Sequence, residues 1–61
     1  MYIGQIFENF GCTWIVDDIY TVPKPVMEKY DLIYSTRYKA HVIEAPAGYL
    51  GITEIDAALY R

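Results

Sequence analysis

The most informative pattern in the chain is an alternation of apolar and polar side chains along residues 31–44. One parity holds Leu32, Tyr34, Thr36, Tyr38, Ala40 and Val42, and the other holds Ser35, Arg37, Lys39 and His41. Successive side chains of an extended chain point to opposite faces, so this pattern predicts a strand with an apolar face and a cationic face. The segment has 14 residues, whereas strands usually span about 5–6. We therefore expect a long, bent strand, as in small barrels. A break near Arg37 is the alternative.

A hairpin is predicted at the N-terminus. Residues 2–8 and 13–20 are rich in β-branched and aromatic side chains, which favours two strands. Residues 9–12 lie between them, and Asn9 and Gly11 there can take the positive φ of a tight turn.

The second strand of this hairpin carries an irregularity. Trp14 and Val16 share one face, but Asp17 and Asp18 break the alternation before Ile19. This break indicates either a β-bulge or the exposed end of the strand.

Prolines mark the middle of the chain. Pro23 and Pro25 lack the N–H group that a sheet ladder needs, so the segment around them lies outside the sheet. Pro25 suits the start of a short helix over residues 26–30. Residues 45–48 contain a proline and a glycine in the order typical of a turn.

The C-terminal part allows two interpretations. Residues 49–52 fit a brief strand. We favour a short final helix over residues 53–60, because Thr53 can cap it and Ile52, Ile55 and Leu59 are spaced for one helical face. The alternative is a last strand through Ile55 with a frayed tail.

These elements predict a mainly β fold within a single domain, residues 1–61. We expect an antiparallel sheet of about four strands with one or two short helical turns. The predicted core residues are Ile6, Trp14, Tyr34, Tyr38, Val42 and Leu59.

Composition limits how this fold is stabilised. A chain of 61 residues buries only about 60% of the surface that its unfolded form exposes. Cys12 is the single cysteine, so no internal disulfide can form, and a reducing, cytoplasmic location is expected. No apolar run approaches the ~20 residues of a membrane span, and the N-terminal residues lack the positive start and long apolar stretch of a secretory signal. We expect a soluble, complete small gene product with no membrane association.

Charge is distributed unevenly along the chain. The net charge is −3, yet residues 1–20 contain only acids, whereas residues 21–41 contain more bases than acids. Overall acidity argues against a general nucleic-acid binder, whose affinity rests on neutralising phosphates.

Residues that could support catalysis are isolated from one another. Asp17 and Asp18 are neighbours on a strand and are expected to point apart, which does not suit a catalytic carboxylate pair. Cys12 and His41 lack a recognisable third group to orient a base, and Ser35 lies in no nucleophile motif. The sequence therefore predicts no enzyme, no cofactor and no metal site.

Seven tyrosines in 61 residues give the best indication of function. A domain this small cannot bury them all, and tyrosine is enriched at protein interfaces. The predicted partner-binding residues are Asp17, Asp18, Tyr20, Tyr30, Arg37, Lys39 and Tyr49.

The spacing of residues 4–19 carries a family resemblance. Gly4, Phe7, Asn9, Gly11, Trp14, Val16 and Ile19 form a pattern that resembles the opening hairpin of small SH3-like barrels in phage-encoded proteins. The resemblance implies an SH3-like half-barrel of phage origin and no enzymatic activity.

Three functional hypotheses follow. The first is a small interaction protein, in its specific form a phage-encoded inhibitor that docks on a host nucleic-acid-handling or defence complex through tyrosines and carboxylates. The second is a single-stranded nucleic-acid-binding module that uses the face of Arg37, Lys39 and His41. The third is a homo-oligomer that buries its apolar surplus between copies. Residues 1–20 contain acids and no base. The simpler explanation of the cationic row is therefore that it complements the chain's own acidic hairpin or a partner.

Overall fold

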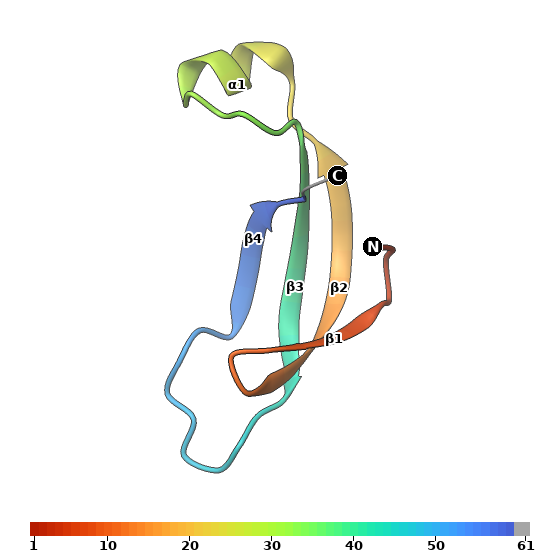
Figure 1. Cartoon of the computed structure of the whole chain (residues 1–61), viewed down its shortest axis with the longest axis vertical. Coiled ribbons are helices and arrows are strands. Elements are labelled where there is room, and N and C mark those ends of the chain that lie inside the picture. The colour runs from red at the N-terminus through yellow and green to blue at the C-terminus, as the bar shows by residue number, and fades with distance from the viewer. Residues whose placement is uncertain (60–61) are drawn as a thin grey trace.

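The described residues form a single open antiparallel sheet with one short helix (Figure 1), as the sequence predicts. The computed structural model describes residues 1–59. Its elements in chain order are β1 (Ile6–Asn9), β2 (Cys12–Thr21), α1 (Lys24–Lys29), β3 (Thr36–Glu44) and β4 (Glu54–Ala58). The strands lie in the order β1-β2-β3-β4, so the described strands do not close into a barrel.

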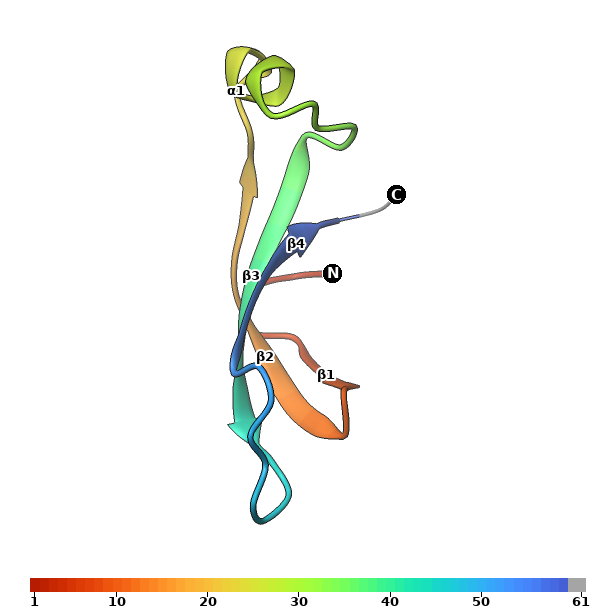
Figure 2. The ribbon, with the colours of Figure 1, turned by 90° about the vertical axis from the view of Figure 1, so that its left-hand side faces the viewer.

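The two central strands are long, and each edge strand covers only part of them. β1 pairs with residues 12–15 of β2, whereas β4 pairs with residues 37–41 of β3, toward the opposite end of the sheet. The molecule is accordingly elongated, with extents of 42 × 22 × 16 Å. Seen from the side, β1 bends out of the plane of the long strands (Figure 2).

A β-bulge interrupts each central strand. In β2, Asp17 is an extra residue between Val16 and Asp18, which pair with consecutive residues of β3. This confirms the irregularity predicted at the two aspartates. In β3, Ile43 is an extra residue in the same way. Bulges bend a strand and increase its twist, which accounts for the curvature of the central ribbon.

The β1–β2 turn lies where the sequence predicts it, but a different residue takes the unusual conformation. Phe10 and Gly11 both have positive φ, 53° and 72°, the pattern of a type I′ hairpin turn. Asn9 was expected to do so; instead its Oδ1 accepts a 3.0 Å hydrogen bond from the Phe10 N–H.

The core forms around Trp14, whose exposed fraction is 0%. Its indole N–H donates a 2.9 Å hydrogen bond to the Asn9 carbonyl, so the buried polar group is satisfied. The Phe7 ring stacks on the indole with ring centroids 6.3 Å apart. Cys12 and Ala40 complete the buried cluster, and partly buried side chains surround it: Phe7, Tyr38, Val42, Tyr49 and Ile55.

Two predicted core residues are exposed. Ile6 is 59% exposed because it lies on the sheet face opposite Trp14's, and Tyr34 is 42% exposed because it precedes β3. The long strand predicted from residue 31 begins only at Thr36, and it continues through Arg37 without a break. Asp31 has a φ of 55°, so the chain turns there instead of extending.

The favoured C-terminal helix is wrong, and the alternative, a last strand through Ile55, is confirmed. Residues 54–58 form β4 and not a helix, and residues 49–52 form a loop and not a strand; residue 60 lies outside the described residues. Helical spacing of three apolar residues was outweighed by ladder hydrogen bonds to β3, such as the 3.0 Å bond from the Val42 N–H to the Thr53 carbonyl. The short helix after Pro23 is confirmed as α1.

Candidate functional site

One face of the sheet carries most of its charged side chains and is called the charged face below. The basic row of β3 runs along its middle, between acids of β2 and of β4. The members of the charged face are Asp17, Asp18, Tyr20, Arg37, Lys39, His41, Glu54 and Asp56. Alternation along β3 places Arg37, Lys39 and His41 on the same side of the sheet, as the sequence predicts.

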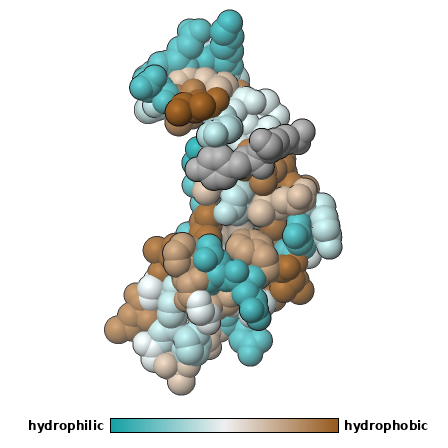
Figure 3. Space-filling model, viewed as in Figure 1, coloured by the Kyte–Doolittle hydropathy of each residue, from teal (hydrophilic) through white to brown (hydrophobic). Residues whose placement is uncertain are grey.

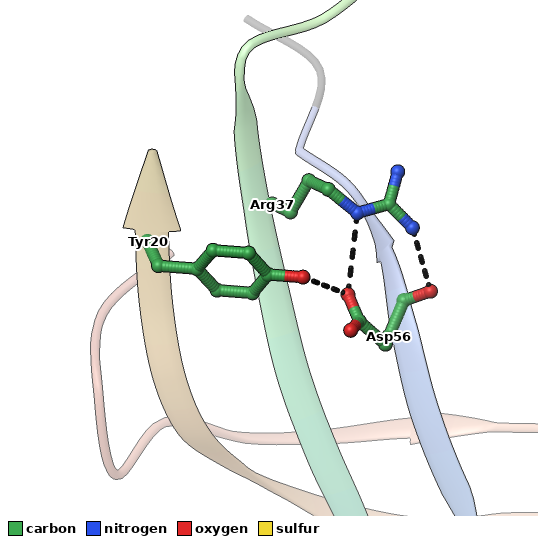
Figure 4. Close-up of polar contacts among 3 residues, drawn as sticks. All are labelled: Tyr20, Arg37 and Asp56. Carbon is green, nitrogen blue, oxygen red and sulfur yellow. Dashed lines mark hydrogen bonds and ion pairs between the residues drawn. The ribbon is translucent and has the colours of Figure 1, made fainter. Parts of the chain in front are cut away.

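A three-residue cluster ties β2 to β4 across β3 (Figure 4). The Tyr20 hydroxyl donates a 2.6 Å hydrogen bond to Asp56 Oδ1. Arg37 Nε contacts the same oxygen at 3.3 Å, and Arg37 Nη2 donates a 2.9 Å hydrogen bond to the Asp56 carbonyl. The guanidinium therefore holds both the side chain and the backbone of the edge strand.

This cluster shifts the titration of two of its members. The Tyr20 hydrogen bond is the largest influence on Asp56 and lowers the pKa of its carboxyl; desolvation opposes it, and the Arg37 guanidinium adds to the lowering. The neighbouring Tyr20 hydroxyl and the Asp56 carboxylate raise the pKa of Arg37. Both shifts favour the charged forms, so the cluster is held in its ionised state.

The other two basic side chains also contact groups of this chain. Lys39 Nζ lies 5.5 Å from the centroid of the Tyr20 ring, a cation–π distance. His41 Nδ1 lies 2.7 Å from Asp17 Oδ2, so the extra residue of the β2 bulge is directed at β3. Asp18 Oδ1 accepts a 2.9 Å hydrogen bond from the Ile19 N–H.

The charged face is consequently acidic despite its basic row. Four carboxylates surround two permanent cations and one histidine, and every basic side chain of the row contacts an acid or a tyrosine. The row is thus the complement of the chain's own acids on both neighbouring strands. A shallow depression on this face is lined by Asp17, Lys39, Ala40, Glu54, Ile55 and Asp56.

Five of the seven predicted binding residues come together on this face, and two tyrosines do not. Tyr30 follows α1 at one end of the molecule and is 63% exposed, with Lys29 Nζ 5.5 Å from its ring centroid. Tyr49 packs against the core, and its hydroxyl donates a 2.9 Å hydrogen bond to the Ile52 carbonyl. Desolvation and the nearby Cys12 thiol raise the pKa of Tyr49.

Sequence reasoning missed two members of the charged face, Glu54 and Asp56. Their signal was the strict alternation with Ile55 and Ala57, a strand pattern that the helical spacing of the surrounding apolar residues obscured.

Two of the residues considered for catalysis have other surroundings: His41 lies beside Asp17, and Cys12 is in the core. Cys12 is buried, and its thiol lies 3.6 Å from the Phe10 carbonyl. Within residues 1–59, no group of three or more histidine, cysteine, aspartate or glutamate side chains is arranged to hold a metal ion. In the same described part, no helix has the length and hydropathy needed to cross a lipid bilayer.

The chain exposes more surface than its size requires. Its accessible surface is 4597 Å², whereas a folded monomer of 7.1 kDa exposes about 4,100 Å² on average. Apolar side chains reach this surface from the helix end to the loop that follows β3 (Figure 3). The largest exposed fractions are those of Leu50 (98%), Ile33 (84%), Tyr2 (66%), Tyr30 (63%) and Ile3 (61%).

Comparison with protein-family models, curated proteins and solved structures found no match. The SH3-like resemblance therefore stays a prediction, and the functional argument rests on the chain's own residues.

Proposed function

We propose that this protein is a non-enzymatic interaction protein that docks onto a partner protein through its charged face. The observation that carries the proposal is the surplus of carboxylates on this face, where four acids stand against two permanent cations. Such a face complements a basic surface of the kind that normally holds phosphates.

The side chains of the charged face are held in fixed positions, which supports a role in binding. Tyr20, Arg37 and Asp56 already hold one another in place before any partner arrives. Pre-organised side chains lose less conformational entropy on association, which strengthens binding for a given contact area. The excess accessible surface adds a second reason to expect a partner, because apolar side chains outside the core gain free energy when they are covered.

In its most specific form, the proposal describes a phage-encoded inhibitor that competes with nucleic acid for a host nucleic-acid-handling or defence complex. The acidic face would occupy the partner's phosphate-binding surface. The nucleic-acid-binding alternative needs cations that are available to phosphates, whereas Arg37 and His41 are already paired with acids and Lys39 contacts Tyr20. A mobility-shift assay at low salt tests this alternative directly.

A homo-oligomer is the second candidate function, and one observation favours it. Ile6 and Ile15 are cross-strand partners on the same face of the sheet, and Ile6 is 59% exposed. Two copies that pack these side chains together would cover them. Sedimentation velocity across a range of concentrations tests this candidate, and a monomer at high concentration would remove it.

The proposed docking is tested by reversing charge on the face. Pull-down from cells of the native host, with mass spectrometry, compares the natural chain with the double variant Asp17→Lys, Asp18→Lys. The matched control is Glu28→Lys with Asp31→Lys, which changes net charge equally at two exposed positions outside the sheet. We expect the partner to be lost from the first variant and retained by the control. Equal recovery with both variants would refute docking through the charged face.

A further inference from the structure

The outer edge of β4 is an open hydrogen-bonding edge. The Val42 N–H donates to the Thr53 carbonyl at 3.0 Å, and the Leu59 N–H donates to the Thr36 carbonyl at 2.8 Å. Backbone groups alternate in direction along an antiparallel strand. The N–H and C=O groups of Glu54, Asp56 and Ala58 therefore point away from β3, at the edge of the sheet.

The other open edge of the central ribbon is better protected against strand addition. Beyond the end of β1, β2 carries the Asp17 bulge. The Asp18 carboxylate also accepts a hydrogen bond from the Ile19 N–H, so that donor is not available to an added strand. Bulges and charges of this kind discourage edge-to-edge pairing. β4 has no proline, lysine or bulge; its guards are the carboxylates of Glu54 and Asp56 and the Arg37 guanidinium on the Asp56 carbonyl.

A second copy of this chain is a poor occupant of the β4 edge. Full-length antiparallel pairing of two β4 strands about a two-fold axis would place Asp56 opposite Asp56. It would also gather both copies of Glu54 on the same face. Like charges directly opposite each other destabilise a strand pair. The same carboxylates would stabilise a strand that carries lysine or arginine.

We propose that β4 accepts a basic extended segment of the partner protein as a fifth, antiparallel strand of the sheet. This inference rests on the proposed function and names the partner's chemistry. Directly opposed residues in an antiparallel pair share a face. Cations of the added segment therefore lie beside Glu54 and Asp56, and its alternate apolar residues lie beside Ile55 and Ala57, which are partly buried at the core side. Small Ala57 leaves room there for a larger neighbour.

The strand geometry can be tested with model peptides. The probe is a heptapeptide of alternating lysine and valine, titrated into the isotope-labelled full chain and followed by amide NMR and hydrogen exchange. We expect slower exchange at the amides of Glu54, Asp56 and Ala58. In an antiparallel register the lysine residues turn their N–H groups toward β4. N-methylation of the lysines should therefore weaken binding about tenfold or more, because the hydrogen bonds opposite both Glu54 and Asp56 are lost, whereas N-methylation of the valines should not.

A variant of the protein provides the matching test. Ala58→Pro removes an outward N–H without changing charge or a bond to β3, and Ala58→Val is its control. We expect the proline variant alone to lose affinity for the peptide. If it does not fold, the two methylated peptides still decide the question.

Two results would overturn the inference. The first is an absence of shifts at β4 at millimolar peptide. The second is equal binding of the two methylated peptides, which would show attraction by charge alone. Neither result affects the docking test with Asp17→Lys and Asp18→Lys, so failure of the β4 edge is distinguishable from failure of the proposed function.

Discussion

The Tyr20 hydroxyl donates a 2.6 Å hydrogen bond to the Asp56 carboxylate across the whole width of β3. This bond joins two residues 36 positions apart and fastens the edge strand β4 to a central strand that it does not otherwise pair with. Arg37, between them in space, bonds to the same carboxylate. The cluster therefore adds side-chain bonds to the backbone ladder that joins β4 to β3.

Replacement of Tyr20 by phenylalanine removes this bond while keeping the ring. We expect a loss of about 0.5–1.5 kcal/mol in the free energy of unfolding, toward the lower end because the bond is exposed. Urea denaturation monitored by Trp14 fluorescence measures it. Tyr30→Phe is the control, since Tyr30 is 63% exposed and lies at the helix end; an equal loss in both variants would contradict the role of the Tyr20 bond.

Acid should weaken the same attachment. The folded-state pKa of Asp56 lies below its ordinary value because Tyr20 and Arg37 stabilise the carboxylate. The stabilisation is thus present above the unfolded pKa of about 3.9 and is lost as pH falls through the lower folded pKa. Urea midpoints from pH 7 to pH 2 should show the advantage of the natural chain over Asp56→Asn shrinking below about pH 4. A constant difference down to pH 2 would refute the assignment.

The hairpin turn predicts a contrast between two substitutions at Phe10. Its positive φ costs an ordinary side chain about 1–2 kcal/mol, whereas asparagine adopts that conformation readily. Both Phe10→Ala and Phe10→Asn lose the edge-to-face contact with Trp14, whose ring centroid is 6.2 Å away. We expect Phe10→Asn to be more stable than Phe10→Ala by about 1 kcal/mol in urea denaturation. Equal stability of the two variants would show that the turn does not strain Phe10.

The core depends on one large side chain. Truncation of a buried tryptophan costs about 3–5 kcal/mol, and a domain of 61 residues has only about 3–9 kcal/mol in total. Trp14→Ala should therefore abolish or nearly abolish cooperative thermal unfolding, followed by circular dichroism. Leu50→Ala, at a position that is 98% exposed, should leave the transition unchanged. A cooperative transition near the natural midpoint in Trp14→Ala would contradict this account of the core.

Local pattern predicted the parts of this fold that local chemistry controls. The aspartate pair broke the strand alternation and marked the bulge at Asp17, and the proline pair marked the start of α1. The error at residues 53–60 has a long-range cause. The spacing of Ile52, Ile55 and Leu59 fits a helix as well as a strand. The strand is favoured because β3, distant in sequence, offers backbone hydrogen-bonding groups and places basic side chains opposite Glu54 and Asp56.

The members of the candidate site that lie on predicted strands could be predicted from the sequence, and the others could not. Asp17, Tyr20 and Lys39 lie on predicted strands, so their meeting on one face followed from the antiparallel pairing. Asp56 could be placed only once β4 was known. Tyr49 was separated from the site because its side chain packs against the buried core cluster, a preference that no periodicity encodes.

The two edge strands are secured at different ends by different forces. Apart from the backbone ladders, β1 is held where Phe7 packs on Trp14, whereas the side-chain bonds of β4 lie at Tyr20 and Asp56, beyond the bulge. Acid or high salt acts on the second attachment and leaves the first intact, so the sheet should open in stages instead of all at once. The first species to appear on acidification would retain the hairpin and its tryptophan core while β3 gained a free edge. The protein would then present a different strand for pairing from the one it presents at neutral pH.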